Sequence, residues 1–192
     1  PVLDPVRVHQ QIRRPHEQGT RDGFFVEEIS QTGFTSTFAF PVFEPMTYVT
    51  CGFQGNLGFG FQAALGVKVA HPDKVVISIT GDGGFMMNSQ EIETALRLKL
   101  NLVVMVLNDS SYGMIRWKQQ DAGFSDWGLE FNNPDFVRYA ESYGAKAHRI
   151  ESADSFISTF DKAFNDGGVH LIEVPVDYSE NQRVLIDELA EK

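Results

Sequence analysis

The stretch "KVVISITGDGGFMMNSQEIETALRLKLNLVVMVLND", residues 74–109, alternates two apolar runs with a helical pattern. The runs 74–80 and 102–107 are nearly continuous in apolar residues, which is typical of strands that are buried on both faces of a sheet. Between them, residues 89–99 place apolar side chains at helical spacing among charged ones, and Ser89 could cap such a helix. Strand, helix and strand in this order predict a βαβ unit of a parallel sheet.

The remainder of the chain continues this alternation of helices and strands. Helical patterns cover residues 55–70, 134–142 and 153–165, and strand patterns cover residues 46–51 and 169–176. Residues 23–30 fit either a strand or the start of a helix. We therefore predict an α/β fold with three layers, in which a parallel sheet has helices on both faces.

The first 22 residues differ from the rest, because they are polar and contain three prolines. This composition predicts a linker or arm, residues 1–22, ahead of one domain that spans residues 23–192. Because the chain begins at Pro1 rather than at methionine, we expect it to be part of a longer polypeptide.

The aromatic segment "FTSTFAFPVF", residues 34–43, could belong to the core, but we favour a surface that meets another domain or subunit.

The composition limits the classes of partner that the chain can have. Of the 192 residues, 42% are hydrophobic, and the formal net charge is −10. An acidic chain suits neither nucleic acids, whose binding needs a basic surface, nor anionic membranes, and no apolar run approaches membrane-spanning length. The single cysteine, Cys51, excludes an internal disulfide and fits a reducing compartment. We expect a cytoplasmic protein that holds anionic ligands locally, through backbone amides and a cation.

A turn with three glycines and an aspartate follows the first buried strand. Asp82 lies between Gly81 and the pair Gly83 and Gly84, and Asp109 follows the second buried strand. Ligands of open parallel sheets bind at the carboxyl ends of the strands, so these two aspartates can converge if the strands are neighbours. Two carboxylates would repel a bare phosphate, but they suit a phosphate that binds together with Mg²⁺. The glycines allow close approach of the backbone, and the start of the following helix favours an anion.

The commoner phosphate-binding loops are absent from the sequence. No GxxxxGK[ST] motif is present, so there is no P-loop lysine. The segment "GNLGFG", residues 55–60, has its glycines in an order that does not match the dinucleotide-binding fingerprint. The glycine turn with Asp82 is therefore the strongest candidate for a phosphate site in this chain.

These residues also match a known signature. Residues 81–109 resemble the signature of thiamine-diphosphate-dependent enzymes, in which GDG is followed at a set distance by Asn; here 24 residues separate Gly83 from Asn108. Residues 50–68 look like the glycine-containing helix before this signature, and residues 111–119 look like the segment after it. The closing "IEVPVDYSEN" is similar to the C-terminus of acetolactate synthases. The resemblance implies the diphosphate-binding domain of such an enzyme, most like the acetolactate synthase large subunit.

The resemblance implies roles for individual residues. It makes Asp82 and Asp109 the side-chain ligands of Mg²⁺, and the backbone carbonyl of Ser111 the third protein ligand. It puts Leu57 beneath the thiazolium ring of thiamine diphosphate, where a large apolar residue forces the cofactor to bend. The remaining cofactor-binding residues that it implies are Ser30, Gln31, Thr32, Gly55, Asn56, Gly81, Gly83, Gly84, Tyr112, Gly113 and Met114.

Three positions depart from the family pattern and leave the substrate open. Asp109 stands where Asn is commoner, and Leu57 stands where acetohydroxyacid synthases usually have Met. Trp117 is displaced by one residue from the tryptophan of the biosynthetic acetohydroxyacid synthases. From the residues alone, the alternatives are that Asp82 and Asp109 are turn residues and that Leu57 is an ordinary core residue.

The resemblance further implies an enzyme that decarboxylates a 2-oxo acid such as pyruvate and adds the product to a second 2-oxo acid. In this family a glutamate from a separate pyrimidine-binding domain activates the cofactor, so we expect no such catalytic residue here and almost no activity from this chain alone. FAD would bind only through an absent middle domain, and we expect a homodimer or homotetramer at full length. Two alternatives remain: a subunit of a two-chain 2-oxo-acid decarboxylase, and a non-catalytic cofactor-binding module.

Overall fold

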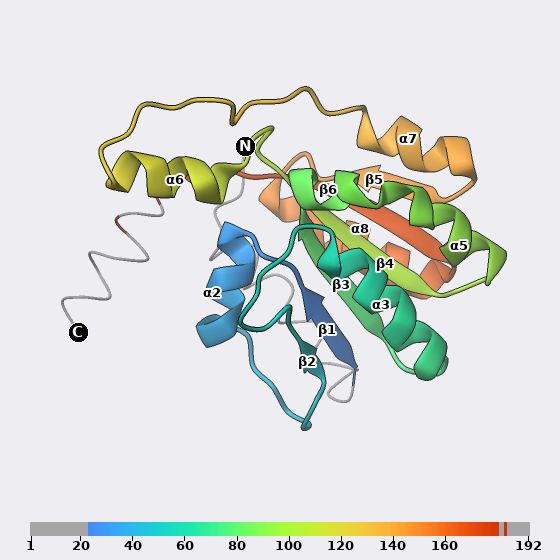
Figure 1. The fold of residues 1–192 in the computed structure, drawn as a ribbon. Coiled ribbons are helices and arrows are strands. Elements are labelled where there is room, and N and C mark those ends of the chain that lie inside the picture. The colour runs from blue at the N-terminus through green and yellow to red at the C-terminus, as the bar shows by residue number, and fades with distance from the viewer. Residues whose placement is uncertain (1–22, 181–182, 184–192) are drawn as a thin grey trace.

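A parallel six-stranded sheet forms the centre of the molecule (Figure 1). The computed structural model describes residues 23–180 and residue 183, so the predicted linker, residues 1–22, lies outside the described residues. The strands are β1 (Phe24–Glu27), β2 (Tyr48–Val49), β3 (Val76–Gly81), β4 (Leu102–Asn108), β5 (Lys146–Arg149) and β6 (Val169–Pro175). Their spatial order is β2-β1-β3-β4-β6-β5, and every neighbouring pair is parallel, which confirms the predicted sheet.

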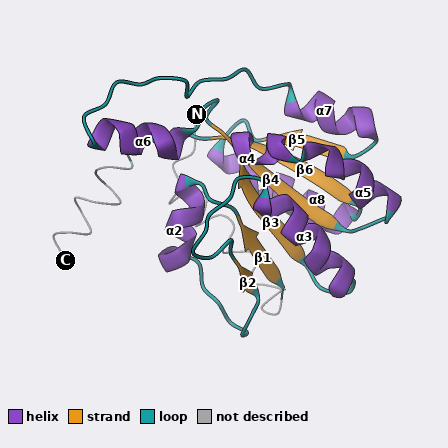
Figure 2. Ribbon diagram, viewed as in Figure 1, coloured by secondary structure: helices purple, strands orange, loops and turns teal. Residues whose placement is uncertain are grey.

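Helices cover both faces of this sheet, as the three-layer prediction requires (Figure 2). They are α2 (Gln31–Ala39), α3 (Phe59–Ala70), α4 (Asp82–Met87), α5 (Ile92–Arg97), α6 (Gly113–Asp121), α7 (Phe136–Tyr143) and α8 (Ala153–Asp166). Helices α3, α4, α5 and α7 pack on one face, whereas α8 and the end of α2 pack on the other. None of the helices in the described part of the chain is long and apolar enough to cross a membrane.

Each central strand sends side chains into both hydrophobic layers, which explains the nearly continuous apolar runs. In β4, Met105 packs on the α8 side and Val104 on the α3 side, and both are buried. The layer under α8 contains Phe156 and Phe160, whose rings are stacked with their centroids 6.3 Å apart. The two layers fix the register of the sheet, because a slip of one residue would exchange the faces of every side chain.

The segment between β3 and β4 differs from the single helix predicted over residues 89–99. A short helix already begins at Asp82, a 3₁₀ turn covers Ser89–Glu91, and α5 follows. The prediction that Ser89 caps a helix is wrong, because its hydroxyl is 2.8 Å from the Tyr139 hydroxyl and α5 has no side-chain cap. Packing against α7 therefore overrides the local capping preference of this serine.

Besides α4, the sequence analysis did not predict α2, α6 and β5. Helix α6 buries no residue, so it has no apolar stripe that periodicity could detect. Strand β5 lies at the edge of the sheet and reads "KAHR", which lacks the apolar character of the central strands. Helix α2 contains a glycine and three threonines, which are weak helix formers, and it is started by the Ser30 side chain, which accepts a 2.9 Å hydrogen bond from the Gly33 amide.

The aromatic segment 34–43 divides between core and surface. Phe40 is buried and its ring lies 4.0 Å from that of Phe25, centroid to centroid. Phe34, Val42 and Phe43 are exposed to solvent. Among the side chains that the structure describes, the segment thus contributes Phe40 to the hydrophobic core and presents Phe34, Val42 and Phe43 at the surface.

Candidate functional site

The candidate site lies where the chain leaves the sheet in two opposite directions. After β1 the chain enters α2, which packs towards the α8 side, and after β3 it enters α4 and α5 on the other side. Because β1 and β3 are neighbours, a crevice opens between their carboxyl ends. Ligands of open α/β sheets bind at such a switch point. A cavity of about 370 Å³ is present there.

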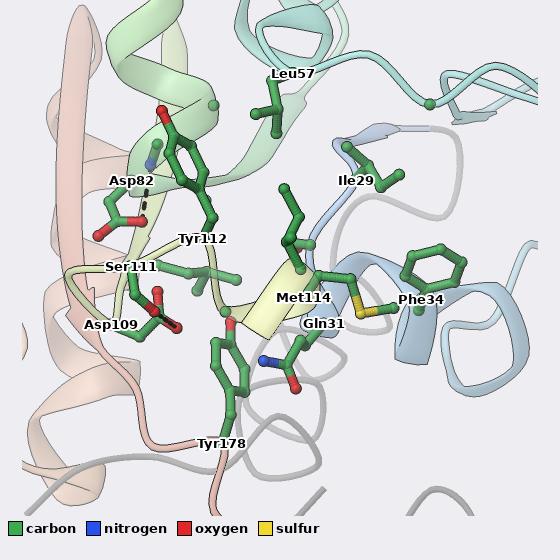
Figure 3. A pocket seen from close by; sticks show the side chains of 18 of the residues that line it. Ile29, Gln31, Phe34, Leu57, Asp82, Asp109, Ser111, Tyr112, Met114 and Tyr178 are labelled. Carbon is green, nitrogen blue, oxygen red and sulfur yellow. Dashed lines mark hydrogen bonds between the residues drawn. The ribbon is translucent and has the colours of Figure 1, made fainter. Parts of the chain in front are cut away.

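Most of the residues that the sequence predicts for the site line this cavity (Figure 3). They are Ser30, Gln31, Gly55, Leu57, Gly81, Asp82, Gly83, Gly84, Asp109, Ser111, Tyr112, Gly113 and Met114. Thr32 and Asn56 do not line it: Thr32 is buried with its hydroxyl 3.2 Å from that of Tyr178, and Asn56 is exposed. The structure thus brings together residues from four separate stretches of the chain at one edge of the sheet.

The cavity has a polar side and an apolar side. In Figure 3, Asp82, Asp109 and Ser111 lie on one side, whereas Leu57 and Ile29 lie across from them. The lining residues that the sequence analysis did not identify are Ile29, Phe34, Leu107, Ile115, Lys118 and Tyr178. Such a cavity suits a ligand with a charged end and an apolar ring system.

Asp82 is held by three hydrogen bonds from neutral groups. Its Oδ1 accepts from the Gly83 amide at 2.8 Å, and its Oδ2 accepts from the Ser110 amide at 2.8 Å and from Asn133 Nδ2 at 2.7 Å. The side chain is 2% exposed, and this burial raises the pKa of Asp82 to about 6, although the hydrogen bond from Asn133 opposes the rise. Asp109 raises this pKa further, because the two carboxylates repel each other.

Asp109 lies in the tight turn after β4. Burial raises the pKa of Asp109 above its ordinary value, and the Ser111 hydroxyl, which donates to Oδ2 at 3.0 Å, opposes the rise. Ser110 between them has a φ of 54°, which is in the left-handed region and costs a non-glycine residue about 1 kcal/mol or more. This conformation aims the Ser110 amide at Asp82, and it is the kind of backbone strain that functional sites often contain.

The glycine at position 113 is required by the approach of Asp109. A β-carbon at Gly113 would overlap the Asp109 carboxylate, so any larger residue would displace it. Gly113 also begins α6, directly after Tyr112. The same glycine therefore fixes the position of a candidate metal ligand and the start of a helix that borders the cavity.

Two functional candidates were missed by the sequence analysis. Asn133 lies in the coil between α6 and α7 and donates to Asp82. Glu28 follows β1, is fully buried, and accepts hydrogen bonds from the Gly58 amide and the Thr80 hydroxyl. Glu28 lies next to two predicted site segments, but a single buried glutamate after a strand has no periodic signature. The Asn-Pro-Asp order that precedes α7 indicates a helix start, yet it does not reveal the contact with Asp82.

The donor groups in the cavity fit a magnesium ion that arrives with a diphosphate. The described residues contain no cluster of three or more histidine, cysteine, aspartate or glutamate side chains that could hold a metal. Mg²⁺ is commonly bound by one or two carboxylates and completes its shell with phosphate oxygens and water. Asp82 and Asp109 supply two carboxylates whose pKa values are raised because burial penalises their charged forms, although Arg116 opposes the rise at Asp109. A divalent cation would remove that penalty.

Comparisons with known proteins show which sequences this chain resembles. Residues 28–174 match the family model described as "Thiamine pyrophosphate enzyme, C-terminal TPP binding domain". The acetolactate synthase of Bacillus subtilis is 38% identical over 150 residues, which make up 78% of this chain and 26% of that protein. The acetolactate synthase large subunit of Haemophilus influenzae is 32% identical over 183 residues, 94% of this chain and 31% of that protein.

A solved structure shows the same fold. The thiamine diphosphate-dependent 4-hydroxybenzoylformate decarboxylase of Rhodococcus jostii superposes with a TM-score of 0.84 at 29% sequence identity. The superposition covers 93% of this chain and 33% of that one. The chain therefore spans about a quarter to a third of the length of the relatives that it matches.

Proposed function

Since the chain belongs to the thiamine pyrophosphate enzyme family and forms its C-terminal cofactor-binding domain, we propose that the cavity between β1 and β3 binds thiamine diphosphate together with Mg²⁺. The observation that supports the metal most directly is the buried carboxylate of Asp82. All of its hydrogen-bond partners among the described residues are neutral donors, so its charge has no cationic partner there. A divalent cation at this carboxylate would supply one.

The proposed ligands of Mg²⁺ are the carboxylates of Asp82 and Asp109 and the backbone carbonyl of Ser111. The diphosphate would lie against the backbone of the glycine turn and of the segment at the start of α6. The residues proposed for this contact are Ser30, Gln31, Gly81, Gly83, Gly84, Tyr112, Gly113 and Met114, all of which line the cavity. Leu57, with Gly55 beside it, would support the ring portion of the cofactor from the apolar side.

When bound, thiamine diphosphate supplies the reactive carbon that adds to the carbonyl group of a 2-oxo acid. The contribution of this chain is to bind and orient. The carboxylates would hold the charged end at the polar side of the cavity, and Leu57 and Ile29 would contact the ring portion on the opposite side. No catalytic acid or base is assigned to this chain, because we propose that the activating glutamate comes from a separate pyrimidine-binding domain.

For the whole protein, we propose a carboligase like acetolactate synthase, which decarboxylates pyruvate and adds the product to a second 2-oxo acid. The names of the relatives support this assignment. A 2-oxo-acid decarboxylase is the alternative, and the name of the structural neighbour favours it. Product analysis with pyruvate separates the two: acetolactate supports the carboligase, and acetaldehyde alone supports the decarboxylase.

We propose that residues 1–22 link this domain, residues 23–192, to domains outside the present sequence, and that the chain alone is nearly inactive. The pyrimidine-binding domain of the same or a neighbouring subunit would close the cavity, in a homodimer or homotetramer. FAD would bind only through a middle domain. We propose a cytoplasmic enzyme, and the formal net charge of −10 supports one without nucleic-acid partners.

Calorimetric titration with thiamine diphosphate, with and without Mg²⁺, tests the binding proposal. We expect Mg²⁺-dependent binding to the wild-type chain, its loss in Asp82→Ala, and no change in Asp161→Ala. Asp161 is a matched control, because it is an exposed aspartate on α8. Binding that survives in Asp82→Ala contradicts the role of Asp82. If the chain alone does not bind, the same titration on the full-length protein decides, and failure there overturns the proposal.

A further inference from the structure

The side chain of Asn133 connects the two segments that contain the candidate metal ligands. Its Nδ2 donates to Asp82 Oδ2 at 2.7 Å and to Asn108 Oδ1 at 3.0 Å. Asp82 follows β3, and Asn108 ends β4 immediately before Asp109. A carboxylate can only accept, so the amide nitrogen of Asn133 must face Asp82. Both of its hydrogens are then used, one on each segment.

The coil that contains Asn133 is itself anchored at the same edge of the sheet (Figure 1). Asp135, two residues later, forms an ion pair with Arg149 at 3.5 Å. Arg149 in turn pairs with the buried Glu173 at 2.8 Å, and Glu173 accepts a 2.8 Å hydrogen bond from Asn108 Nδ2. Because Asn108 also accepts a hydrogen bond from Asn133, these contacts form a closed network. The position of the Asn133 amide is therefore determined by strands β4, β5 and β6.

We propose that Asn133 is a positioning residue that sets the orientation of the Asp82 carboxylate for the metal ion, an inference that rests on the function proposed above. Of the three donors to Asp82, the other two are backbone amides: that of Gly83 in the first turn of α4 and that of Ser110 in the turn after β4. Asn133 is the donor that comes from a third segment, 51 residues further along the chain. Asn133 therefore restrains rotation of the carboxylate plane. With the two backbone amides alone, this rotation would be less restricted.

Loss of the Asn133 donor should weaken metal binding. A hydrogen-bond partner that orients a metal ligand typically changes metal affinity by about 10- to 100-fold. Asn133→Leu removes the donor while keeping the volume, so that water cannot replace the amide. Asn133→Ala is the second variant, because it introduces no bulk and tests the same donor if Leu prevents folding. Asn132→Ala is the matched control, since Asn132 is the neighbouring asparagine and is exposed.

The test is a titration with Mn²⁺, followed by electron paramagnetic resonance, on the chain or on the full-length protein, whichever binds thiamine diphosphate. Mn²⁺ prefers the same oxygen ligands as Mg²⁺. We expect Kd for Mn²⁺ to rise about 10- to 100-fold in Asn133→Leu and in Asn133→Ala, and to stay within about twofold in Asn132→Ala. The Tm measured without metal reports whether a variant is folded as stably as the wild type. In the Asn133 variants, the rise in Tm that Mn²⁺ produces should be smaller than in the wild type, even where the metal-free Tm is unchanged.

Two results would count against this inference in different ways. If Asp82→Ala loses Mn²⁺ binding while both Asn133 variants bind like the wild type, the positioning role is wrong and the proposed function stands. If the wild type binds no Mn²⁺ in either form, or if Asp82→Ala binds it unchanged, the metal site itself is wrong. In that case the proposed function and the inference both fail.

Discussion

The carboxylate of Glu28 occupies the space that a side chain at position 84 would need. A β-carbon on Gly84 would overlap this carboxylate, so the glycine turn and the end of β1 fit together only because residue 84 has no side chain. The same carboxylate accepts hydrogen bonds from the Gly58 amide, one residue after Leu57, and from the Thr80 hydroxyl. Glu28 thus connects β3, the loop that contains Leu57 and the glycine turn beside the cavity.

Gly84→Ala should destabilise the protein, although alanine is the better helix former. The added methyl group would displace a buried carboxylate, and such overpacking costs about 1 to 3 kcal/mol. Gly66→Ala in α3 is the matched control, because a β-carbon there meets nothing within 4 Å. We expect that substitution to stabilise the protein by about 0.5 to 1 kcal/mol. Urea unfolding of the two variants should therefore give shifts of opposite sign, and equal shifts would contradict the contact with Glu28.

Glu28→Ala should lower the free energy of unfolding by about 1 to 3 kcal/mol, because it leaves the Gly58 amide and the Thr80 hydroxyl without their buried acceptor. Burial raises the pKa of Glu28, so part of this loss is offset by removing a carboxylate that is costly to bury. Glu44→Ala, at an exposed position, should change stability by no more than about 0.5 kcal/mol. Chemical denaturation measures both, and a neutral Glu28→Ala would mean that water or another acceptor replaces the carboxylate.

Metal binding should weaken at acidic pH. The pKa of Asp82 is raised to about 6 by burial, and a proton on this carboxylate competes with the cation. Affinity should therefore be nearly complete at about pH 7, should fall to about half at pH 6, and should reach about one tenth at pH 5. Mn²⁺ titrations between pH 5 and 7.5 measure the profile. In Asp82→Asn the residual affinity should depend less on pH, and a flat wild-type profile would show that Asp82 does not bind the ion.

The hydrophobic layer beneath α8 should contribute strongly to stability. Phe156 is 1% exposed and stacks on Phe160, so Phe156→Ala should lower the free energy of unfolding by about 3 to 5 kcal/mol. Phe124 is 70% exposed, and the same substitution there should have an effect within about 0.5 kcal/mol. Thermal or urea unfolding distinguishes the two variants. Similar losses at both positions would indicate that Phe124 is covered in solution by another molecule.

The sequence predicts those parts of the fold whose signals are local. The buried strands β3 and β4 are continuous apolar runs, and α8 repeats its phenylalanines at helical spacing, so their existence follows from the order of residues alone. Elements without a buried face, such as α6, or at the edge of the sheet, such as β5, lack that signal and were not predicted. The capping role expected for Ser89 failed because a tertiary contact with Tyr139 replaced it.

By itself, the sequence determined the alternation of strands and helices and the pair of aspartates at the ends of two buried strands. Both are matters of spacing along the chain, and spacing is what periodic burial imposes on a sequence. Only the tertiary structure decided that β1 lies beside β3, which opens the cavity. It also decided two hydrogen bonds that each span about 50 residues of chain, one between Glu28 and Thr80 and one between Asn133 and Asp82. Those contacts depend on strand order and on the direction of each crossover, and buried hydrogen bonds between distant segments leave no periodic pattern in the sequence.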